Sequence, residues 1–190
     1  MEKSQWLPYL EKNLSPRRYR HTLGCAKLAD ELAKIYQVDS DKANVAALLH
    51  DVAKELSVEA MQAEIKKTDI TIPEIVRDNP ALLHAYASTA MAQSKFGIDD
   101  EEILNAILYH TTGREAMSLL EKIIFIADAA EENRTYHPQI KQWRQQAKKD
   151  IDNAVLQVLE YNITRVIQRG FLLDENTVKA RNDLVMRNVR

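Results

Sequence analysis

Residues 47–56 read ALLHDVAKEL, and this short stretch decides how the rest of the chain is interpreted. Its apolar start predicts the interior of a helix, yet His50 and Asp51 stand side by side directly after Leu49. A charged aspartate is rarely buried unless it is paired or binds a metal ion. The stretch therefore predicts a core helix whose two polar residues need partners from elsewhere in the chain.

The remainder of the chain has the pattern of a helical protein. Only 4 Gly and 5 Pro interrupt it, and the apolar residues between them recur at helical spacing and do not alternate. One apolar stripe consists of Leu28, Leu32 and Ile35, and His21 and Cys25 continue it toward the N-terminus. We predict an all-α fold, a single helical bundle of about seven to nine helices. The predicted helical segments are 17–36, 39–56, 57–67, 82–96, 99–110, 116–133 and 139–169.

Composition limits the class of protein. A chain of 190 residues with 45% hydrophobic residues can bury one large core, and 28% charged residues favour solubility. The formal net charge of -2 argues against a general nucleic-acid binder. Cys25 is the single cysteine, which excludes an internal disulfide and fits a reducing compartment. With no signal peptide and no long apolar run, we expect a cytoplasmic protein without nucleic-acid or membrane partners.

Six polar residues share an unusual setting, because each lies in or directly after an apolar helical stretch. One histidine on an apolar helix face is more often a hydrogen-bonded core residue than a ligand. Six such residues buried separately would leave many polar groups to satisfy, whereas gathering them around cations satisfies all of them together. The six candidate metal ligands are His21, His50, Asp51, His84, His110 and Asp128.

The donor types indicate which metals would bind. Imidazole and carboxylate without thiolate suit iron, manganese, zinc, cobalt or nickel. Six protein ligands are too many for one catalytic metal with an open position, but they suit two metals about 3.5–4 Å apart. Asp51 is the natural bridge between the two metals, and His50 then reaches one of them.

The order of these residues resembles the HD-domain metal-dependent phosphohydrolases, an all-helical superfamily. The flanking stretches resemble its YqeK-type branch, the bacterial symmetrical diadenosine tetraphosphate hydrolases, from about Arg18 to Asn182. The stretches that carry the resemblance are RYRHTLG, LLHDVAKEL, LLHAYAS, AILYHTTGREAMSLLEKIIFIADAAEENR and TVKARN.

The resemblance implies a di-iron or similar centre that splits diadenosine tetraphosphate into two ADP molecules. It also implies one domain over 1–190, with a metal-site core at about 18–135 and scaffold helices at about 139–190. One metal would take His21, His50, Asp51 and Asp128, and the other would take His84, His110 and the second oxygen of Asp51. The substrate partner would be a small nucleotide, and the oligomeric state stays open, with a homodimer as one candidate.

Several further residues are candidates for binding phosphate. Lys54 lies one turn beyond His50 and Asp51 and is expected to act with Asp51 at the reacting centre, although it could be a solvated lysine beside Glu55. Arg18 precedes His21 by three residues and is likewise a candidate for binding phosphate. The HTTGR stretch after the fourth histidine offers a phosphate-facing turn or an ordinary helix end. Its candidate residues are Thr111, Thr112, Gly113 and Arg114.

Residues beyond Asp128 are candidates for an outer layer of the site. Glu131 and Arg134 could pair with each other or orient ligands and phosphate. Tyr86 departs from the small residues usual in the family and could stack on a base or pack in the core. A second departure is RTYHPQI, where the family usually has a Pro-Gly pair, so the loop after Arg134 is expected to differ.

The expected reaction is hydrolysis of a phosphoanhydride. A water shared by two metals becomes a nucleophile because its pKa falls to about 7, and nearby cations stabilise the phosphoryl charge. In-line attack on an inner phosphate would then expel ADP. The open alternatives are an HD phosphatase for another nucleotide or alarmone, a di-iron oxygenase, and a non-catalytic metal-stabilised interaction module. Lys54 stands where alarmone hydrolases tend to carry acidic residues, which counts against that alternative.

Overall fold

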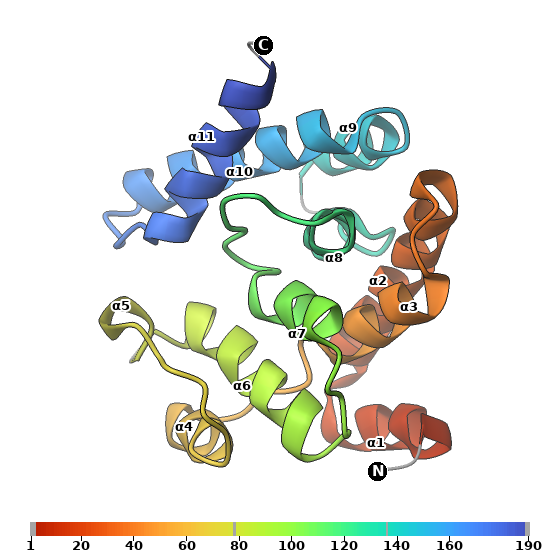
Figure 1. Ribbon diagram of the computed structural model, residues 1–190, viewed down its shortest axis with the longest axis vertical. Helices are drawn as coiled ribbons and strands as arrows, with labels where there is room; N and C mark the ends of the chain where they lie inside the picture. Colours follow the sequence, from red (N-terminus) through yellow and green to blue (C-terminus); the bar gives the residue numbers. More distant parts are fainter. Residues whose placement is uncertain (1–2, 78, 136, 189–190) are drawn as a thin grey trace.

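Helices account for the secondary structure of the residues that the computed structural model describes, which are 3–77, 79–135 and 137–188. These residues form eleven α-helices and no strand (Figure 1), which confirms the all-α prediction with slightly more helices than expected. The elements are the 3₁₀ turn Lys3–Gln5 and helices α1 Trp6–Asn13, α2 Pro16–Tyr36, α3 Ser40–Leu49, α4 Val58–Ile65, α5 Glu74–Arg77, α6 Pro80–Ser94, α7 Glu101–Leu108, α8 Leu119–Ala130, α9 Gln139–Ala147, α10 Ile151–Gln168 and α11 Glu175–Asn188.

Most of these helices begin at a side chain that caps the first turn. The Ser57 hydroxyl accepts a hydrogen bond from the Ala60 amide, and the Asp100 carboxylate accepts from two amides of α7. Such caps satisfy donors that have no partner within the helix. The capping residues are Ser15, Asp39, Ser57, Asn79, Asp100, Ser118 and Asp150.

Helix α8 lies in the middle of the bundle. Residues 123–127 are all buried, as expected for a helix surrounded by others, and α8 contacts α2, α3, α7, α9 and α10. Asp128 follows this run directly, so the helix presents a half-buried carboxylate beside His21 of α2. Helices α2, α3 and α7 pack around α8, and α6 packs on α7 and α3, which brings five helices toward one region.

The C-terminal helices α9, α10 and α11 form a separate layer at the top of Figure 1, and α1 lies at the opposite end. Buried Trp143 of α9 contacts the ring of Tyr161 in α10, and Lys122 of α8 forms a 2.6 Å ion pair with Asp152. This layer therefore packs against α8, but the boundaries of the predicted scaffold region stay a prediction. None of the described helices is both long enough and apolar enough to span a membrane.

Two predicted helices end earlier than the sequence suggested. The segment 39–56 stays helical only to Leu49, because the His50 ring donates to the Ala47 carbonyl and competes with the next amide for it. The following amides bond three residues back, as between Lys54 and Asp51, at 3.0 Å. The predicted segment 99–110 likewise ends early, since α7 ends at Leu108 and His110 lies beyond it. His50, Asp51 and His110 therefore occupy tight turns and do not lie within helices.

Two other predictions about helices were wrong. The segment 139–169 is two helices, because Asp150 has an extended backbone and caps a new helix by accepting from the Asn153 amide. Ile35, predicted to lie on the apolar stripe, is 44% exposed. In the last turn of α2 it is Tyr36 that contacts the neighbouring helix, where its hydroxyl donates to the Ala147 carbonyl at 2.6 Å.

Candidate metal centre

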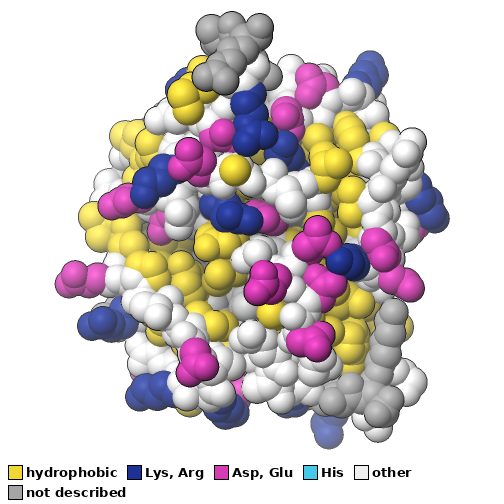
Figure 2. All heavy atoms as spheres, in the orientation of Figure 1, with side chains coloured by type: hydrophobic (Ala, Val, Ile, Leu, Met, Phe, Trp, Pro, Cys, Tyr) yellow, Lys and Arg dark blue, Asp and Glu magenta, His cyan; other side chains and the backbone are white. Residues whose placement is uncertain are grey.

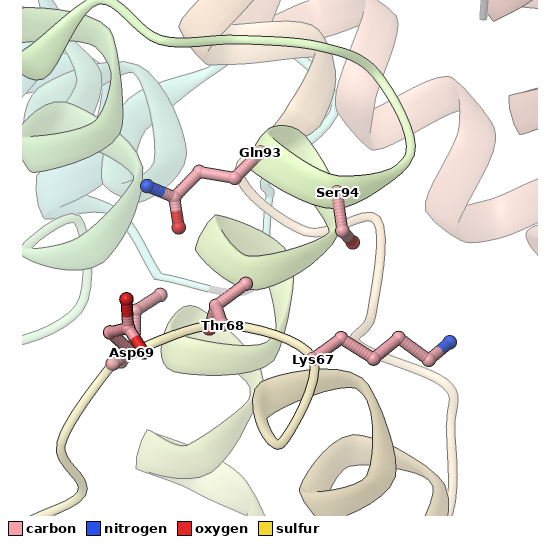
Figure 3. A pocket seen from close by; sticks show the side chains of 6 residues that line it. Lys67, Thr68, Asp69, Gln93 and Ser94 are labelled. Atoms are coloured by element: carbon pink, nitrogen blue, oxygen red, sulfur yellow. The ribbon is translucent and has the colours of Figure 1, made fainter.

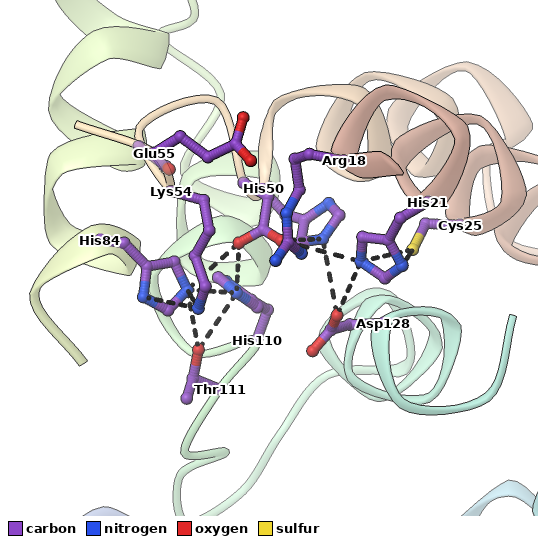
Figure 4. Close-up of polar contacts among 12 residues, drawn as sticks. Arg18, His21, Cys25, His50, Lys54, Glu55, His84, His110, Thr111 and Asp128 are labelled. Atoms are coloured by element: carbon purple, nitrogen blue, oxygen red, sulfur yellow. Dashed lines mark hydrogen bonds and ion pairs between the residues drawn. The ribbon is translucent and has the colours of Figure 1, made fainter. Parts of the chain in front are cut away.

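Four histidines converge in the region where the five helices meet, and three of them are oriented in the same way (Figure 4). In His50, His84 and His110 the Nδ1 atom contacts a main-chain carbonyl three or four residues earlier. Since a carbonyl oxygen only accepts, Nδ1 carries the proton and the lone pair of Nε2 faces the centre. The carbonyl acceptors are those of Ala47 at 2.7 Å, Pro80 at 3.2 Å and Ile107 at 2.7 Å.

Asp51 lies between two pairs of histidines. Its Oδ2 atom is 3.7 Å from His21 Nε2 and 3.4 Å from His50 Nε2. Its Oδ1 atom is 3.2 Å from His84 Nε2 and 3.7 Å from His110 Nε2. Each oxygen of this one carboxylate therefore faces its own pair of imidazole nitrogens.

Asp128 adds a second carboxylate to one half of the cluster. Its Oδ1 atom lies 3.0 Å from His21 Nε2 and 3.7 Å from His50 Nε2. The six predicted ligands are thus brought together in two halves that share Asp51, the same division that the family resemblance implied. Their binding of metal stays a prediction.

The donor atoms of the cluster fit divalent cations. His50 Nε2 and Asp51 Oδ1 are buried and have no hydrogen-bond partner. Lone pairs that face one another without a proton between them repel, and a cation relieves that cost. Ligand atoms of His50, Asp51 and His110 all lie within 4.8 Å of one another. Nitrogen and oxygen donors at this spacing suit a borderline divalent metal.

Both carboxylates of the cluster are held in the charged form. Burial raises the pKa of Asp51, but the neighbouring His50 and the other histidines that face its carboxylate lower it to well below its usual range. Burial also raises the pKa of Asp128, but Arg134, His21 and His50 outweigh this effect and hold the pKa well below its usual range. Two negative charges are therefore available to a cation at neutral pH.

The histidines differ in how readily they take up a proton. Burial lowers the pKa of His84 to about 4, so this ring is neutral and ready to bind a metal. Burial also lowers the pKa of His21, but contacts with Asp128, Cys25 and Glu131 outweigh it and raise the pKa to about 10. A cation must displace a proton from His21, so its binding competes with protons.

Three basic side chains reach the cluster from different segments. Arg18 Nη1 donates to Asp51 Oδ2 at 2.5 Å, and Arg134 Nη2 donates to Asp128 Oδ1 at 2.5 Å. Lys54 Nζ lies 3.0 Å from His84 Nε2, and burial lowers the pKa of this half-buried lysine. Its neighbour Glu55 points elsewhere and accepts two hydrogen bonds from Ser15. The three cations together give the edge of the cluster a charge that suits phosphate.

Beyond His110, the HTTGR turn contributes only Thr111 to the cluster. Thr111 Oγ1 lies 3.1 Å from His110 Nε2, whereas the buried Thr112 hydroxyl donates to the Gly113 carbonyl. Gly113 has φ +65, and a Cβ there would lie 3.1 Å from the Ala180 side chain. Arg114 forms a bidentate pair with buried Glu121. The structure therefore does not bring Thr112, Gly113 and Arg114 to the cluster. Gly113 and Arg114 instead pack the turn against α11 and α8.

Tyr86 packs in the core and is only 9% exposed. Burial, followed by the charge of Asp174, raises its pKa to about 12. The geometry thus agrees with the packing interpretation of this residue and not with an open base-stacking platform. The loop after Arg134 contains Tyr136, which lies outside the described residues.

Glu131 contacts the Nδ1 atom of His21, and its carboxylate lies directly against Gly24, a residue that was not predicted to matter for the site. Its Oε1 atom lies 3.1 Å from His21 Nδ1, and its Oε2 atom accepts from the Asn133 amide at 2.6 Å. A Cβ at Gly24 would lie only 2.3 Å from Glu131 Oε2. Gly24 stands in the middle of α2, where glycine is unfavourable, so this unusual position was the available signal.

A surface pocket of about 520 Å³ lies elsewhere, between the loop after α4 and the end of α6 (Figure 3). Its polar groups have local partners, since Thr68 donates to the Ile65 carbonyl and Ser94 donates to the Ala90 carbonyl. It is lined by Ser94, ten residues along α6 from His84 and so roughly 15 Å away. This pocket has no connection with the cluster.

Comparisons with known proteins agree with the geometry. The HD domain family model matches residues 18–133, more than half of the chain. Two relatives named symmetrical bis(5'-nucleosyl)-tetraphosphatase are 37% identical in Halalkalibacterium halodurans and 35% identical in Bacillus subtilis, over at least 97% of either chain. A crystal structure from Clostridium acetobutylicum, described as a predicted HD superfamily hydrolase involved in NAD metabolism, is 40% identical, covers 98% of both chains and has a TM-score of 0.93. The family match includes all six histidines and aspartates of the cluster, and the chain belongs to the HD-domain family.

Proposed function

We propose that this chain is a metal-dependent hydrolase that cleaves dinucleoside polyphosphates, with diadenosine tetraphosphate split symmetrically into two ADP molecules. The observation that carries the proposal is Asp51, whose two oxygens face two separate pairs of histidines. The names of the relatives in two bacterial species support the choice of substrate.

The proposed ligands are His21, His50, Asp51 and Asp128 for one cation, and His84, His110 and Asp51 for the other. Two divalent cations held there would lower the pKa of a shared water and neutralise charge on the phosphoryl oxygens. We favour iron, with manganese, cobalt, nickel and zinc as the other candidates, because the donors are imidazole and carboxylate.

The remaining roles belong to the basic side chains. Lys54 and Arg18 reach the cluster from the segments on either side of Asp51 and are proposed to hold non-bridging phosphoryl oxygens. Arg134 pairs with Asp128 and would bind a neighbouring phosphate of the polyphosphate chain. Glu131 holds the His21 ring by accepting its Nδ1 proton, which leaves Nε2 free to bind the cation.

A tetraphosphate substrate tests this proposal by its products. Metal-loaded protein is incubated with diadenosine tetraphosphate, and the nucleotides are separated by chromatography. Two ADP per substrate, lost on chelation and restored by added metal, is the expected result. ATP with AMP, or no turnover, contradicts the symmetrical assignment. Parallel reactions with a nucleoside monophosphate and an alarmone test the other hydrolytic activities, and oxygen consumption tests an oxygenase.

Two further expectations concern the setting of the enzyme. We place it in the cytoplasm with a small nucleotide as its partner. Acidic and basic side chains are interspersed on the face shown in Figure 2. A homodimer stays a prediction that sedimentation would test. The large apolar side chains at the junction of α10 and α11 are strongly exposed and suit such an interface. They are Ile167, Phe171 and Leu172.

A further inference from the structure

The single cysteine of the chain lies inside the candidate metal centre. Cys25 follows His21 by one turn of α2 and is only 1% exposed. Its Sγ atom lies 3.5 Å from His21 Nε2 and 3.8 Å from His21 Nδ1, and Figure 4 shows the sulfur beside the ring. The thiol also donates to the Ala127 carbonyl at 3.5 Å.

The sulfur belongs to the same group of donors as the first half of the cluster. One ligand atom from each of His21, Cys25, His50 and Asp128 lies within 4.8 Å of all the others. His50 Nε2 is a member of this group, and it is fully buried without a hydrogen-bond partner. Four donors from two helices and one turn therefore lie close enough to share a cation, and one of the four is sulfur.

We propose that Cys25 Sγ is a further ligand of the cation held by His21, His50 and Asp128, an inference that rests on the proposed function for the presence of that cation. As the bond to the cation forms, the S–H bond breaks and its proton leaves to solvent, so no electron changes hands. The sulfur makes this half of the centre softer than the half formed by His84 and His110. It would therefore select cobalt, iron or zinc over manganese, while the other half stays tolerant.

The competing interpretation treats Cys25 as a small apolar residue that fills the space beneath His21. Under that interpretation a valine of similar size would serve as well, and the identity of the bound metal would not depend on the sulfur. The two interpretations differ in a spectroscopic signal that does not depend on turnover.

Cobalt(II) reports a bound thiolate directly. Metal-free full-length protein is titrated with cobalt(II), and the near-ultraviolet absorption is followed for a thiolate-to-cobalt charge-transfer band. Because the chain has 1 Cys, such a band has one source. The variants are Cys25→Val, which removes the donor at similar size, and Cys25→Ser, which replaces sulfur by oxygen.

The expected result is a band in the wild-type protein that disappears in both variants, while cobalt still binds to the remaining ligands. Competition between cobalt and manganese should then shift toward manganese in Cys25→Val. Cobalt bound to the wild-type protein without the band overturns this inference and leaves the proposed function intact. Failure of cobalt, iron, zinc and manganese to bind at all overturns both. The wild-type spectrum alone decides the matter if either variant fails to fold.

Discussion

At the residue scale, Asp51 has two carboxylate oxygens that serve different partners. Replacing it with asparagine keeps the shape but turns one oxygen into an N–H donor and removes the charge that both halves share. We expect Asp51→Asn to lose at least one bound metal per chain and to lose hydrolysis, measured by metal analysis and product chromatography. Asp30→Asn, at an exposed ion pair with Lys34, is the control and should behave as wild type. Full metal content and activity in Asp51→Asn would refute the bridging role.

Gly24 is needed because Glu131 lies directly against the backbone of α2. A methyl group there would meet Glu131 Oε2 at 2.3 Å, so we expect Gly24→Ala to destabilise the protein by about 1–3 kcal/mol through overpacking. Removing the carboxylate should rescue most of the loss, since Gly24→Ala made in a Glu131→Ala background meets only the Asn133 side chain, whose Nδ2 atom lies 2.9 Å from the added Cβ. Urea unfolding of the four proteins measures this coupling. Additive free energies would show that the contact is not tight.

Lys54 is proposed to bind phosphate and not metal, and the two roles predict different measurements. We expect Lys54→Met to lower kcat/KM by about 10- to 100-fold, the loss of one charged hydrogen bond. Its metal content should not change, because the ligands stay in position. Lys34→Met on the exposed face of α2 is the matched control. A loss of metal in Lys54→Met would assign the lysine to the ligand shell and not to substrate.

At the element scale, the turns after α3 and α7 are as important as the helices. His50 and His110 each end a helix by donating to the carbonyl three residues earlier, at 2.7 Å in both cases. The donation takes the carbonyl that the next helical amide would use, and it fixes Nε2 toward the centre. Each histidine therefore both ends its helix and fixes the orientation of its own Nε2 atom.

Asp150 divides the C-terminal layer into α9 and α10. Its carboxylate accepts from the Asn153 amide at 3.0 Å, and its loss should leave the first turn of α10 uncapped. We expect Asp150→Ala to cost about 0.5–2 kcal/mol of the free energy of unfolding. Asp150→Asn keeps a capping oxygen and should cost much less. Equal costs for the two variants in urea unfolding would show that the cap contributes little.

The sequence predicted the helical class and the six clustered polar residues, because both depend on periodic patterns within single segments. It missed the ends of α3 and α9, since a histidine donating to its own helix and an aspartate within a polar run give no strong periodic signal. Contacts such as Gly24 with Glu131 join residues more than a hundred positions apart, so only the fold reveals them. The phosphate-binding role predicted for Arg114 gains no support, because its guanidinium pairs with Glu121 of α8, a contact that the sequence does not reveal.

At the scale of the whole molecule, the cluster joins five helices, so cation binding and folding should be coupled. In the metal-free protein, protonated His21, with a pKa raised to about 10, contributes stability below its unfolded pKa of about 6.5. That contribution is lost as pH rises toward 10. We therefore expect the metal-free protein to unfold more easily at pH 9.5 than at pH 6.5, and metal-loaded protein to lose less.

Thermal unfolding of the wild type and His21→Asn at several pH values, with and without metal, measures this linkage. The variant should lose part of the alkaline dependence of the metal-free protein. His50 should retain the rest, because burial lowers its pKa but the charges of Asp51 and Cys25 outweigh burial and raise it. An unchanged dependence in His21→Asn would assign it to another group. On the acidic side, Asp51 and Asp128 have lowered pKa values, so their contribution exists above about pH 4 and is lost as pH falls further.

The central structural claim is that Asp51 divides one set of ligands between two cations. Anomalous diffraction from crystals of metal-loaded protein measures this most directly. We expect two peaks about 3.5–4 Å apart, one beside Asp51 Oδ2 with His21, His50 and Asp128, and one beside Asp51 Oδ1 with His84 and His110. A single peak, or two peaks that Asp51 does not contact, would contradict the account.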